Sequence, residues 1–549
     1  MSAKRNGESP VSRRLWTLFA ALTLLLLPGQ GRSAAAEEPV PLEPGRKQLF
    51  LDDHIVGEIR NLDRVMHRPA KRGAVLLPDR PWDGRFTATV SAPMWIEGEG
   101  HYKMVYEGRP LRYAEEGFRW ALATSRDGLA WEKPDLGAVD FRGSRANNLI
   151  AAPENKRLWH VIHDPDDSDP ARRYKGFLGH SGRRPVVSPD AVHWTILEVP
   201  VLPSGDAGTL TYDRERRQFL GLLKFGGKYG RSYNLSVSKD FVNWSEPRFF
   251  FSTDERDQEH ALEVIRRRIA DPGLARPLFV DPDPSIGWTP PEVEFRNRGI
   301  WNAQSYNIGV FPYEGLYMGL PMIFYPTGRR LPERRNADGF HLIQLAMTRD
   351  LQHWERLGNR EPFIGPSRLD QGLAGNYDRM QLMPTNRPVE KDEELWFYYS
   401  GFKWRVCPYD RYLDGSPRSP ETLNPQERAD YVDDAHSAIH VAVLRRDGFV
   451  SLDAGRREGT LTTRPLVMSG SRLWVNLDAA EGRIRVEVLD AGGRPIPGFS
   501  GGDSLSLGGD RTRFPIRWNG SDSVARLSGQ TVVLRIHLRK GSLYALWTE

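Results

Sequence analysis

The sequence is poor in cysteine: Cys407 is the only one among 549 residues. A single cysteine permits no internal disulfide, so a large core must stabilise the fold, and the 16 tryptophans, 18 tyrosines and 23 phenylalanines can supply it. No Cys/His motif surrounds Cys407, so we do not expect it to act as a nucleophile. The chain also has no Walker loop, no GxGxxG motif after a strand, no HExxH and no CxxC. We therefore expect no cofactor and no bound metal.

Long apolar runs are missing as well, except for one near the start of the chain. Leu15–Pro28 is apolar, follows the basic residues 4, 5, 13 and 14, and precedes Ser33–Ala36, which offers an Ala-x-Ala cleavage signal. The run is shorter than the roughly 20 residues that a membrane span needs. We therefore expect residues 1–36 to be a secretory leader. The mature chain would then be exported to the periplasm or the exterior, with no membrane span of its own.

A strong charge of one sign is absent once the leader is set aside. The whole chain has a net charge of +5, but residues 1–36 hold five of its 76 Lys and Arg and one of its 71 Asp and Glu. The remaining residues therefore carry a net charge of +1. This balance gives no electrostatic basis for binding nucleic acid, and we expect no nucleic-acid partner.

Helical periodicity is scarce, and Gln258–Ala270 is the best helix candidate. What recurs instead is an aspartate four residues before a tryptophan, placed after a β-rich stretch. Such an aspartate can accept hydrogen bonds from the backbone of a tight turn, and the tryptophan can pack between neighbouring sheets. We predict that these turns are structural and do no chemistry. The pairs are Asp127/Trp131, Asp190/Trp194, Asp240/Trp244 and Asp350/Trp354, with a degenerate fifth copy at Asp447.

The repeat predicts an all-β fold, a five-bladed β-propeller over residues 37–455 followed by a C-terminal β-sandwich over residues 456–549. The first three aspartates are 63 and 50 residues apart, close to the roughly 40–50 residues of one four-stranded blade. In this interpretation the fifth blade ends on the strand Phe449–Ala454. Beyond Gly455, alternating strands are separated by Gly- and Asp-rich turns, a pattern typical of a sandwich.

Several stretches resemble a known group of proteins. The S-x-D-x-x-x-W turns, with Leu49–Val56, Asp169–Phe177, Pro312–Pro321 and Gly448–Leu466, resemble exported bacterial proteins of the glycosyl hydrolase family 32-like type. That group looks like part of the glycoside hydrolase superfamily of families 32, 43 and 68. The resemblance implies a five-bladed propeller, a carbohydrate substrate and catalysis by carboxylates. The Asn-Asp-Pro-Asn, Arg-Asp-Pro and Glu-Cys motifs of family 32 are not present in intact form.

The geometry of a blade restricts where a site can lie. The turns that join strands one to two and three to four share one rim, while the loops between strands two and three share the other rim with the blade connections. The Asp/Trp turns occupy the first rim, so we expect the site on the second. His163-Asp164-Pro165 is similar to an Arg-Asp-Pro variant, but it lies in a turn between strands one and two. We therefore leave Asp164 out of the site and interpret its surroundings as an acidic hairpin turn.

Carboxylates on the second rim are the candidates for catalysis. Glycoside hydrolysis normally uses two of them, about 5–5.5 Å apart for retention and roughly 6.5–9.5 Å apart for inversion. Asp206 and Asp378 each precede an inner strand and are the preferred pair, and Glu107 is the preferred proton donor. The other candidates are Asp83 and Asp53 for catalysis and Trp404, Arg405 and Arg379 for substrate binding, with Lys228 on a loop of the same rim.

The leading hypothesis is an exported glycosidase that acts on a poly- or oligosaccharide through a carboxylate pair at the propeller axis. The missing family 32 motifs favour an alternative, a non-catalytic propeller that binds glycans. A third possibility is an interaction scaffold whose rim binds protein.

Overall fold

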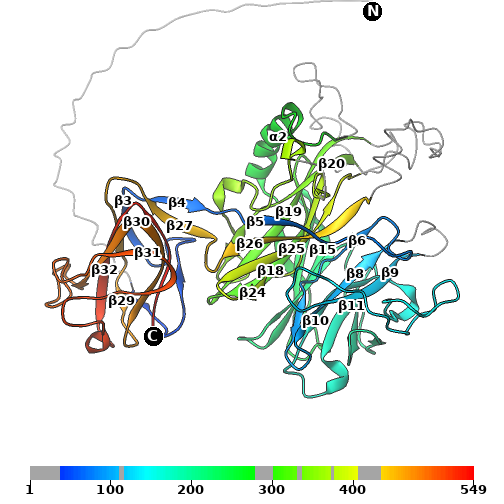
Figure 1. Cartoon of the computed structure of the whole chain (residues 1–549), viewed down its shortest axis with the longest axis horizontal. Helices are drawn as coiled ribbons and strands as arrows, with labels where there is room; N and C mark the ends of the chain where they lie inside the picture. The colour runs from blue at the N-terminus through cyan, green and yellow to red at the C-terminus, as the bar shows by residue number, and fades with distance from the viewer. Residues whose placement is uncertain (1–37, 110–116, 278–300, 330–336, 372–375, 406–434) are drawn as a thin grey trace, which may run out of the picture. The chain divides into compact units, whose positions relative to one another are not determined.

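The computed structural model describes residues 38–109, 117–277, 301–329, 337–371, 376–405 and 435–549. β-Strands are the main regular structure of these residues (Figure 1), which confirms the prediction of a β-rich fold. Helix α2 (Glu255–Ala270) contains the predicted helical stretch and begins three residues earlier. It begins there because Asp254 and Asp257 form a reciprocal capping box with the first backbone N–H groups.

Three four-stranded antiparallel sheets occupy the chain between residues 87 and 252. In the second and third sheets the strands pair in the order in which they follow one another. In the first sheet two short strands share one partner, since β6 and β7 both pair with β8. The strands are β6 Thr87–Ala88, β7 Met94–Ile96, β8 His101–Gly108 and β9 Arg119–Ser125; β10 Leu158–His163, β11 Tyr174–Leu178, β12 Arg184–Ser188 and β13 Thr195–Ile196; β14 Gly208–Asp213, β15 Gln218–Gly227, β16 Gly230–Ser238 and β17 Arg248–Ser252.

A ten-stranded sheet follows, and it consists of two halves. A parallel pairing of His341 with Gln381 joins them. Strand β5, from near the N-terminus, pairs antiparallel with β26 and forms the edge of the second half. The first half holds β18 Gln304–Tyr313, β19 Leu316–Arg329, β20 Ala337–Ile343, β21 Ala346–Thr348 and β22 Glu355–Arg356; the second holds β23 Gln381–Pro384, β24 Val389–Lys391, β25 Glu394–Phe402, β26 Ser437–Arg445 and β5 Ala70–Leu76.

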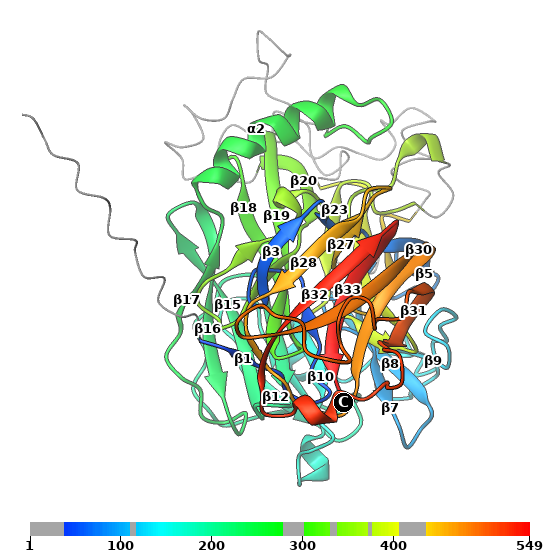
Figure 2. The ribbon, with the colours of Figure 1, turned by 90° about the vertical axis from the view of Figure 1, so that its left-hand side faces the viewer.

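The remaining strands form an eleven-stranded sheet, in which Figure 2 shows β3, β28, β32, β30 and β33 side by side. It combines residues 40–66, which the sequence assigned to the first domain, with the C-terminal strands. The strands are β1 Val40–Pro41, β2 Gln48–Leu49, β3 Val56–Arg60, β4 Asp63–Met66, β27 Val450–Ala454, β28 Gly459–Thr463, β29 Leu466–Val467, β30 Leu473–Asp490, β31 Leu507–Pro515, β32 Thr531–Arg539 and β33 Gly541–Thr548.

The prediction that Phe449–Ala454 closes the fifth blade is wrong. Strand β27, which covers most of this stretch, pairs with β33 and β4. The edge of β26 that it was expected to occupy is already taken by β5. Burial explains the difference, because Leu452 packs in the same core as Leu461 and Leu543.

The four Asp/Trp turns have the predicted geometry. One carboxylate oxygen of each aspartate accepts the backbone N–H groups two and three residues ahead, at 2.7–2.9 Å. The tryptophans pack against a neighbouring sheet, as Trp244 does on Phe177 with ring centroids 5.4 Å apart, Trp354 on Phe250 at 5.2 Å and Trp131 on Tyr398 at 6.2 Å. These contacts explain the recurrence of the motif in structural terms.

The degenerate fifth copy has a different role. Asp447 is completely buried and accepts hydrogen bonds from the ammonium of Lys47 at 2.8 Å and from the hydroxyl of Tyr313 at 2.6 Å. The amide of Asn476 donates a third bond at 3.0 Å. Asp447 therefore ties together segments that precede β2, end β18 and lie within β30, a connection that no other Asp/Trp aspartate makes among the described residues.

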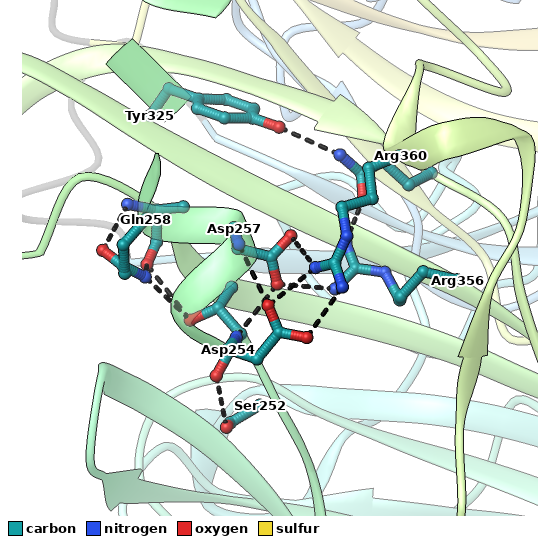
Figure 3. A network of polar contacts seen from close by, with 10 residues as sticks. Ser252, Asp254, Asp257, Gln258, Tyr325, Arg356 and Arg360 are labelled. Carbon is teal, nitrogen blue, oxygen red and sulfur yellow. Dashed lines mark hydrogen bonds and ion pairs between the residues drawn. The ribbon is translucent and has the colours of Figure 1, made fainter. Parts of the chain in front are cut away.

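Buried ion pairs hold the N-terminal turn of α2 against the first half of the ten-stranded sheet (Figure 3). The carboxylate of Asp257 forms ion pairs with Arg356 at 2.8 Å and with Arg360 at 2.7 Å. All three side chains are nearly inaccessible to solvent. Asp254 binds Arg360 with both oxygens, at 2.8 and 2.7 Å. Each buried guanidinium of this network thus has a carboxylate partner, as the low dielectric of an interior requires.

Candidate functional site

Asp206 lies on a short loop directly before β14. The buried guanidinium of Arg183 holds this loop, because it donates to the backbone oxygens of Gly179 at 3.1 Å and Gly205 at 2.9 Å and also contacts that of Asp206. The side chain of Asp206 is 38% exposed. The loop therefore presents an accessible carboxylate on a fixed backbone.

The partner of Asp206 is a buried lysine. Nζ of Lys224, on β15, lies 3.6 Å from Oδ2 of Asp206, which is an ion pair but too long for a hydrogen bond. Among the described residues Nζ has no hydrogen-bond partner, although Lys224 is only 7% exposed. Burial lowers the pKa of Lys224 to about 7, against the opposing effect of Asp206 and with the help of Arg231 and Arg183. Burial raises the pKa of Asp206, but the positive charge of Lys224 and its neighbours outweighs this and lowers it overall.

Two further cations share an aromatic ring with Lys224. Nζ of Lys224 lies 4.4 Å from the centroid of Tyr306, the guanidinium carbon of Arg231 lies 5.2 Å from it, and that of Arg405 lies 5.5 Å from it. Arg231 stands at the start of β16, Tyr306 on β18 and Arg405 after β25. Residues from the third sheet and from both halves of the ten-stranded sheet therefore meet at this ring, and we call Asp206, Lys224, Arg231, Tyr306 and Arg405 the rim cluster.

A buried histidine adjoins the rim cluster. The ring of His341, on β20, stacks on Phe324 with centroids 4.6 Å apart and meets Tyr306 edge-on at 4.5 Å. Neither ring nitrogen has a hydrogen-bond partner among the described residues. Burial lowers the pKa of His341 well below its ordinary value, and Arg405, Arg231 and Lys224 lower it further. His341 is therefore neutral and adds no charge.

Glu107, the predicted proton donor, lies at the end of β8 and is connected to the rim cluster through Arg157. Its carboxylate accepts from Nε of Arg109 at 2.8 Å and lies 3.8 Å from Arg157, while the residue is only 4% exposed. Arg157 also approaches His180 at 3.4 Å, and His180 lies 3.5 Å from Asp206. The structure thus brings Glu107, Asp206 and Arg405, three of the predicted residues, into one connected charge network.

Asp378 is placed differently. It is completely buried, and its Oδ2 accepts from Lys71 at 2.6 Å and from the hydroxyl of Tyr399 at 2.8 Å. Its other oxygen, Oδ1, has no hydrogen-bond partner in the part of the chain that the structure describes. Burial raises the pKa of Asp378, but His440 and Lys71 lower it overall. No contact in the described residues joins Asp378 to Asp206.

Asp83 and Asp53 are both engaged away from the rim cluster. Asp83 is completely buried, bound by Lys133 at 2.6 Å and by the hydroxyl of Tyr106 at 3.0 Å, and burial raises its pKa despite these partners. Asp53 is 74% exposed and pairs at 2.6 Å with Arg64, on β4 of the eleven-stranded sheet.

The remaining residues predicted for this rim make other contacts. Arg379 donates from Nε to the backbone oxygen of Asn376 at 2.8 Å. Trp404 directly precedes Arg405 in the chain, and its backbone oxygen lies 3.3 Å from a ring nitrogen of His436. Lys228 is exposed and lies 4.8 Å from the ring of Tyr229.

Sequence reasoning missed Lys224, Arg231, Tyr306 and His341. Lys224 carried a usable signal, since it is the one charged residue in the strand QFLGLLKFGG. A charged residue in an apolar strand needs a partner or a function. The others carried none, because their proximity depends on how separate sheets meet.

A cavity of about 290 Å³ lies at the opposite ends of the same strands. Its lining includes Tyr212 and Arg214 at the end of β14, whereas Asp206 precedes that strand. The charged residues in the lining neutralise one another or their neighbours: Arg214 binds Asp166 with two bonds of 2.8 Å, and Glu390 lies 3.2 Å from Arg446. The rim cluster, with its unbalanced charge, is the better candidate for chemistry.

The acidic turn between β10 and β11 is held by ion pairs within the chain. The ammonium of Lys175 binds Asp164 at 2.7 Å and Asp167 at 2.8 Å, so the positive charge of the turn comes from the chain itself. No group of three or more His, Cys, Asp or Glu side chains suited to a metal occurs in the described ranges. In those same ranges no helix has the length and apolar character to cross a membrane. Cys407 lies outside them.

No protein-family model matches the sequence, and no curated protein matches it. Among solved structures, the chain is similar to the GH32 β-fructofuranosidase BmSUC1 of Bombyx mori, with 11% identity over 88% of this chain and 95% of that one and a TM-score of 0.35. It is also similar to a fructofuranosidase of Schwanniomyces occidentalis, with 9% identity, 88% and 98% coverage and a TM-score of 0.39. A third similar structure is an exo-β-1,3-galactanase of Phanerochaete chrysosporium, with 10% identity over 88% of this chain and 99% of that one and a TM-score of 0.31. TM-scores this low carry neither a shared fold nor an activity over to this chain.

Proposed function

We propose that this protein is a glycoside hydrolase whose active site is the rim cluster. The observation that carries the proposal is Asp206, an accessible and ionised carboxylate on a loop that Arg183 holds, paired with a buried lysine that lies over the ring of Tyr306. An ionised carboxylate in this position can activate water or attack an anomeric carbon, and aromatic rings bind the apolar faces of sugars. Asp206 is assigned this role of base or nucleophile.

Glu107 is the second carboxylate of the proposal. Its carboxylate accepts a hydrogen bond from Arg109 at 2.8 Å and lies 3.8 Å from Arg157. A general acid must reach the leaving oxygen at hydrogen-bond distance, so Glu107 would act only after a substrate changes these contacts. Asp378, completely buried beside Lys71, is assigned a structural role and is no longer proposed as the catalytic partner of Asp206.

The proposed architecture is a five-bladed propeller with an accompanying sandwich. The support is the succession of three four-stranded sheets and two comparable halves of a larger one, together with a strand from the N-terminus that completes the last of them. Such closure ties the last blade to the N-terminal segment and leaves only short, protected sheet edges in the ring. The eleven-stranded sheet would be the sandwich, built from both ends of the chain.

Export is proposed on the leader signals alone. N-terminal sequencing of the protein recovered outside the cytoplasm should begin near Glu37. Recovery of an intact chain that begins at Met1 in the cytoplasm would reject this proposal.

One observation favours a second candidate, a propeller that binds sugar without cleaving it. Glu107 is nearly inaccessible, which leaves Asp206 as the accessible carboxylate of the connected charge network. Asp206→Asn, assayed with a panel of oligosaccharides, separates the two functions. A hydrolase should keep binding and lose turnover by at least about a hundredfold, whereas a binding protein has no turnover to lose. Asp53→Asn is the control, and near-native turnover of Asp206→Asn would remove Asp206 from catalysis.

A further inference from the structure

The rim cluster contains more positive charge than its carboxylate can neutralise. Lys224, Arg231 and Arg405 surround one ring, and among the described residues Asp206 is the carboxylate that pairs with any of them. Arg231 donates to a neutral acceptor, the side-chain oxygen of Gln304, at 2.7 Å. Nε of Arg405 and Nζ of Lys224 have no hydrogen-bond partner among the residues that the structure describes.

Buried cations elsewhere in the described chain are balanced. Lys133 pairs with Asp83 at 2.6 Å, Lys175 with Asp164 at 2.7 Å and Arg356 with Asp257 at 2.8 Å. Where carboxylates are lacking, backbone oxygens take their place, as they do around Arg183. The rim cluster departs from this rule, and burying charge without a partner is unfavourable unless something else supplies the opposite charge.

The aromatic contacts hold these cations without neutralising them. Tyr306 lies within cation–π distance of all three, and Phe324 lies 5.8 Å from Arg231 and 5.4 Å from Arg405. A ring quadrupole attracts a cation but leaves its full charge available to an anion. The donors are thus positioned before a ligand arrives, which reduces the entropy lost on binding.

We infer that the ligand of this site is an acidic sugar, whose carboxylate or sulfate group is bound jointly by Lys224, Arg231 and Arg405. The inference rests on the proposed function for the identification of a sugar site and adds the chemical class of the sugar. Arginine recognises the two oxygens of such a group with parallel N–H bonds, and lysine adds a compact charge. Asp206 remains beside the anion subsite, where it can act on the adjoining glycosidic bond.

Matched pairs of oligosaccharides test the inference. The probes are a galacturonic acid trisaccharide with its methyl ester, and a sulfated galactose oligosaccharide with its unsulfated form. Binding to the full chain is measured by calorimetry, and turnover is measured on the same compounds. We expect the acidic member of one pair to bind at least about tenfold more tightly than its neutral counterpart, as charge-assisted bonds imply. The pair that shows the preference identifies the anion as a carboxylate or a sulfate.

Variants locate the binding to this cluster. Lys224→Met and Arg405→Gln should each weaken binding of the acidic probe by about 10- to 100-fold, with little change for the neutral one. Lys224→Arg keeps the charge and should retain most of the affinity. Arg405 is half-buried and its Nε makes no hydrogen bond, so its variant tests the site even if the buried Lys224→Met fails to fold. Arg214→Gln, at the opposite ends of the strands, is the control and should bind like the native chain.

The outcomes separate this inference from the proposed function. Equal binding of the acidic and neutral members, or no binding of either acidic probe, overturns the inference. Hydrolysis of the neutral members alone also overturns it and leaves the glycoside hydrolase proposal standing. Preferential binding of an acidic member without hydrolysis supports the inference and rejects catalysis. Loss of binding in Arg214→Gln, with normal binding in Arg405→Gln, would move the site to the opposite cavity and overturn the inference.

Discussion

Nζ of Lys224 and Oδ2 of Asp206 lie 3.6 Å apart, the former buried and the latter accessible. A buried lysine normally loses its proton near neutrality unless an anion stabilises the charge. Asp206 supplies part of this stabilisation, while Arg231 and Arg183 oppose it, and the resulting pKa of about 7 lies far below that of a free lysine. A second anion beside Lys224 would therefore raise its pKa and keep its amino group protonated at neutral pH.

Binding of an acidic oligosaccharide should depend on pH through Lys224. An anion binds the protonated form, so affinity should be greatest below pH 7 and fall by about tenfold between pH 6.5 and pH 8.5. Binding near neutral pH should take up a proton, which calorimetry in two buffers of different ionisation enthalpy detects. An affinity that stays constant over this range would contradict the prediction.

The groups that face Lys224 define the control for this measurement. Asp206, Arg231, Arg183, Tyr233 and Tyr306 surround it, and His180 contacts Asp206. Lys224→Arg should abolish the pH dependence, because arginine stays charged throughout the range. His180→Asn should keep it. Loss of the dependence in His180→Asn would show that Lys224 is not its source.

Asp378→Asn should reduce stability by about 1–3 kcal/mol at pH 7, since it leaves the ammonium of Lys71 without its carboxylate. The pKa of Asp378 is lowered in the folded protein. Its contribution is therefore present above the unfolded value of about 3.9 and is lost as the pH falls through the lower folded value. Urea unfolding should show that the difference in the free energy of unfolding between the native chain and the variant is smaller at acidic pH than at pH 7.

Two controls accompany Asp378→Asn. Adding Lys71→Met should recover part of the lost stability, because the unpaired charge is removed. Turnover of the folded fraction should stay within a few fold of native. A loss of a hundredfold or more without a change in stability would restore Asp378 as a catalytic residue.

The sequence predicted the features that depend on contacts between residues close together in the chain. The Asp/Trp turns were found because each aspartate bonds to amides two and three residues away, and α2 was found from its own periodicity, without its cap at Asp254. Strand β5 was missed at its place beside β26, because the pairing of Gly73 with Val441 links distant parts of the chain. The rim cluster was found only at Asp206 and Arg405 for the same reason. Lys224 alone carried a warning, a charge within an apolar strand.

Asp190→Ala and Asp240→Ala should each lower the free energy of unfolding by about 0.5–2 kcal/mol, in the range of a lost cap. Burial opposes ionisation of Asp240, but the N–H groups of Asn243 and Val242 outweigh it and lower its pKa to about 2, which reflects these bonds. Turnover of the folded variants should not change, because these turns lie at the ends of the strands opposite Asp206. Asp53→Ala, which breaks an exposed pair with Arg64, should cost less than about 0.5 kcal/mol. Lost turnover in a fully folded Asp240→Ala protein would show that the active site lies on the rim of the Asp/Trp turns and not on that of Asp206.

Asp257→Ala should have the largest effect on stability, about 3–5 kcal/mol, because it leaves the buried guanidinium of Arg356 without a carboxylate and removes one of the two carboxylates that bind Arg360. Asp254→Ala is the matched comparison. Asp254 caps the same helix and binds Arg360, but its side chain is about half exposed, so its loss should cost only about 1 kcal/mol. Urea unfolding compares the two, and amide hydrogen exchange along α2 shows whether the helix is released. Equal effects of the two substitutions would mean that the cap, and not the buried ion pairs, holds α2 to the sheet.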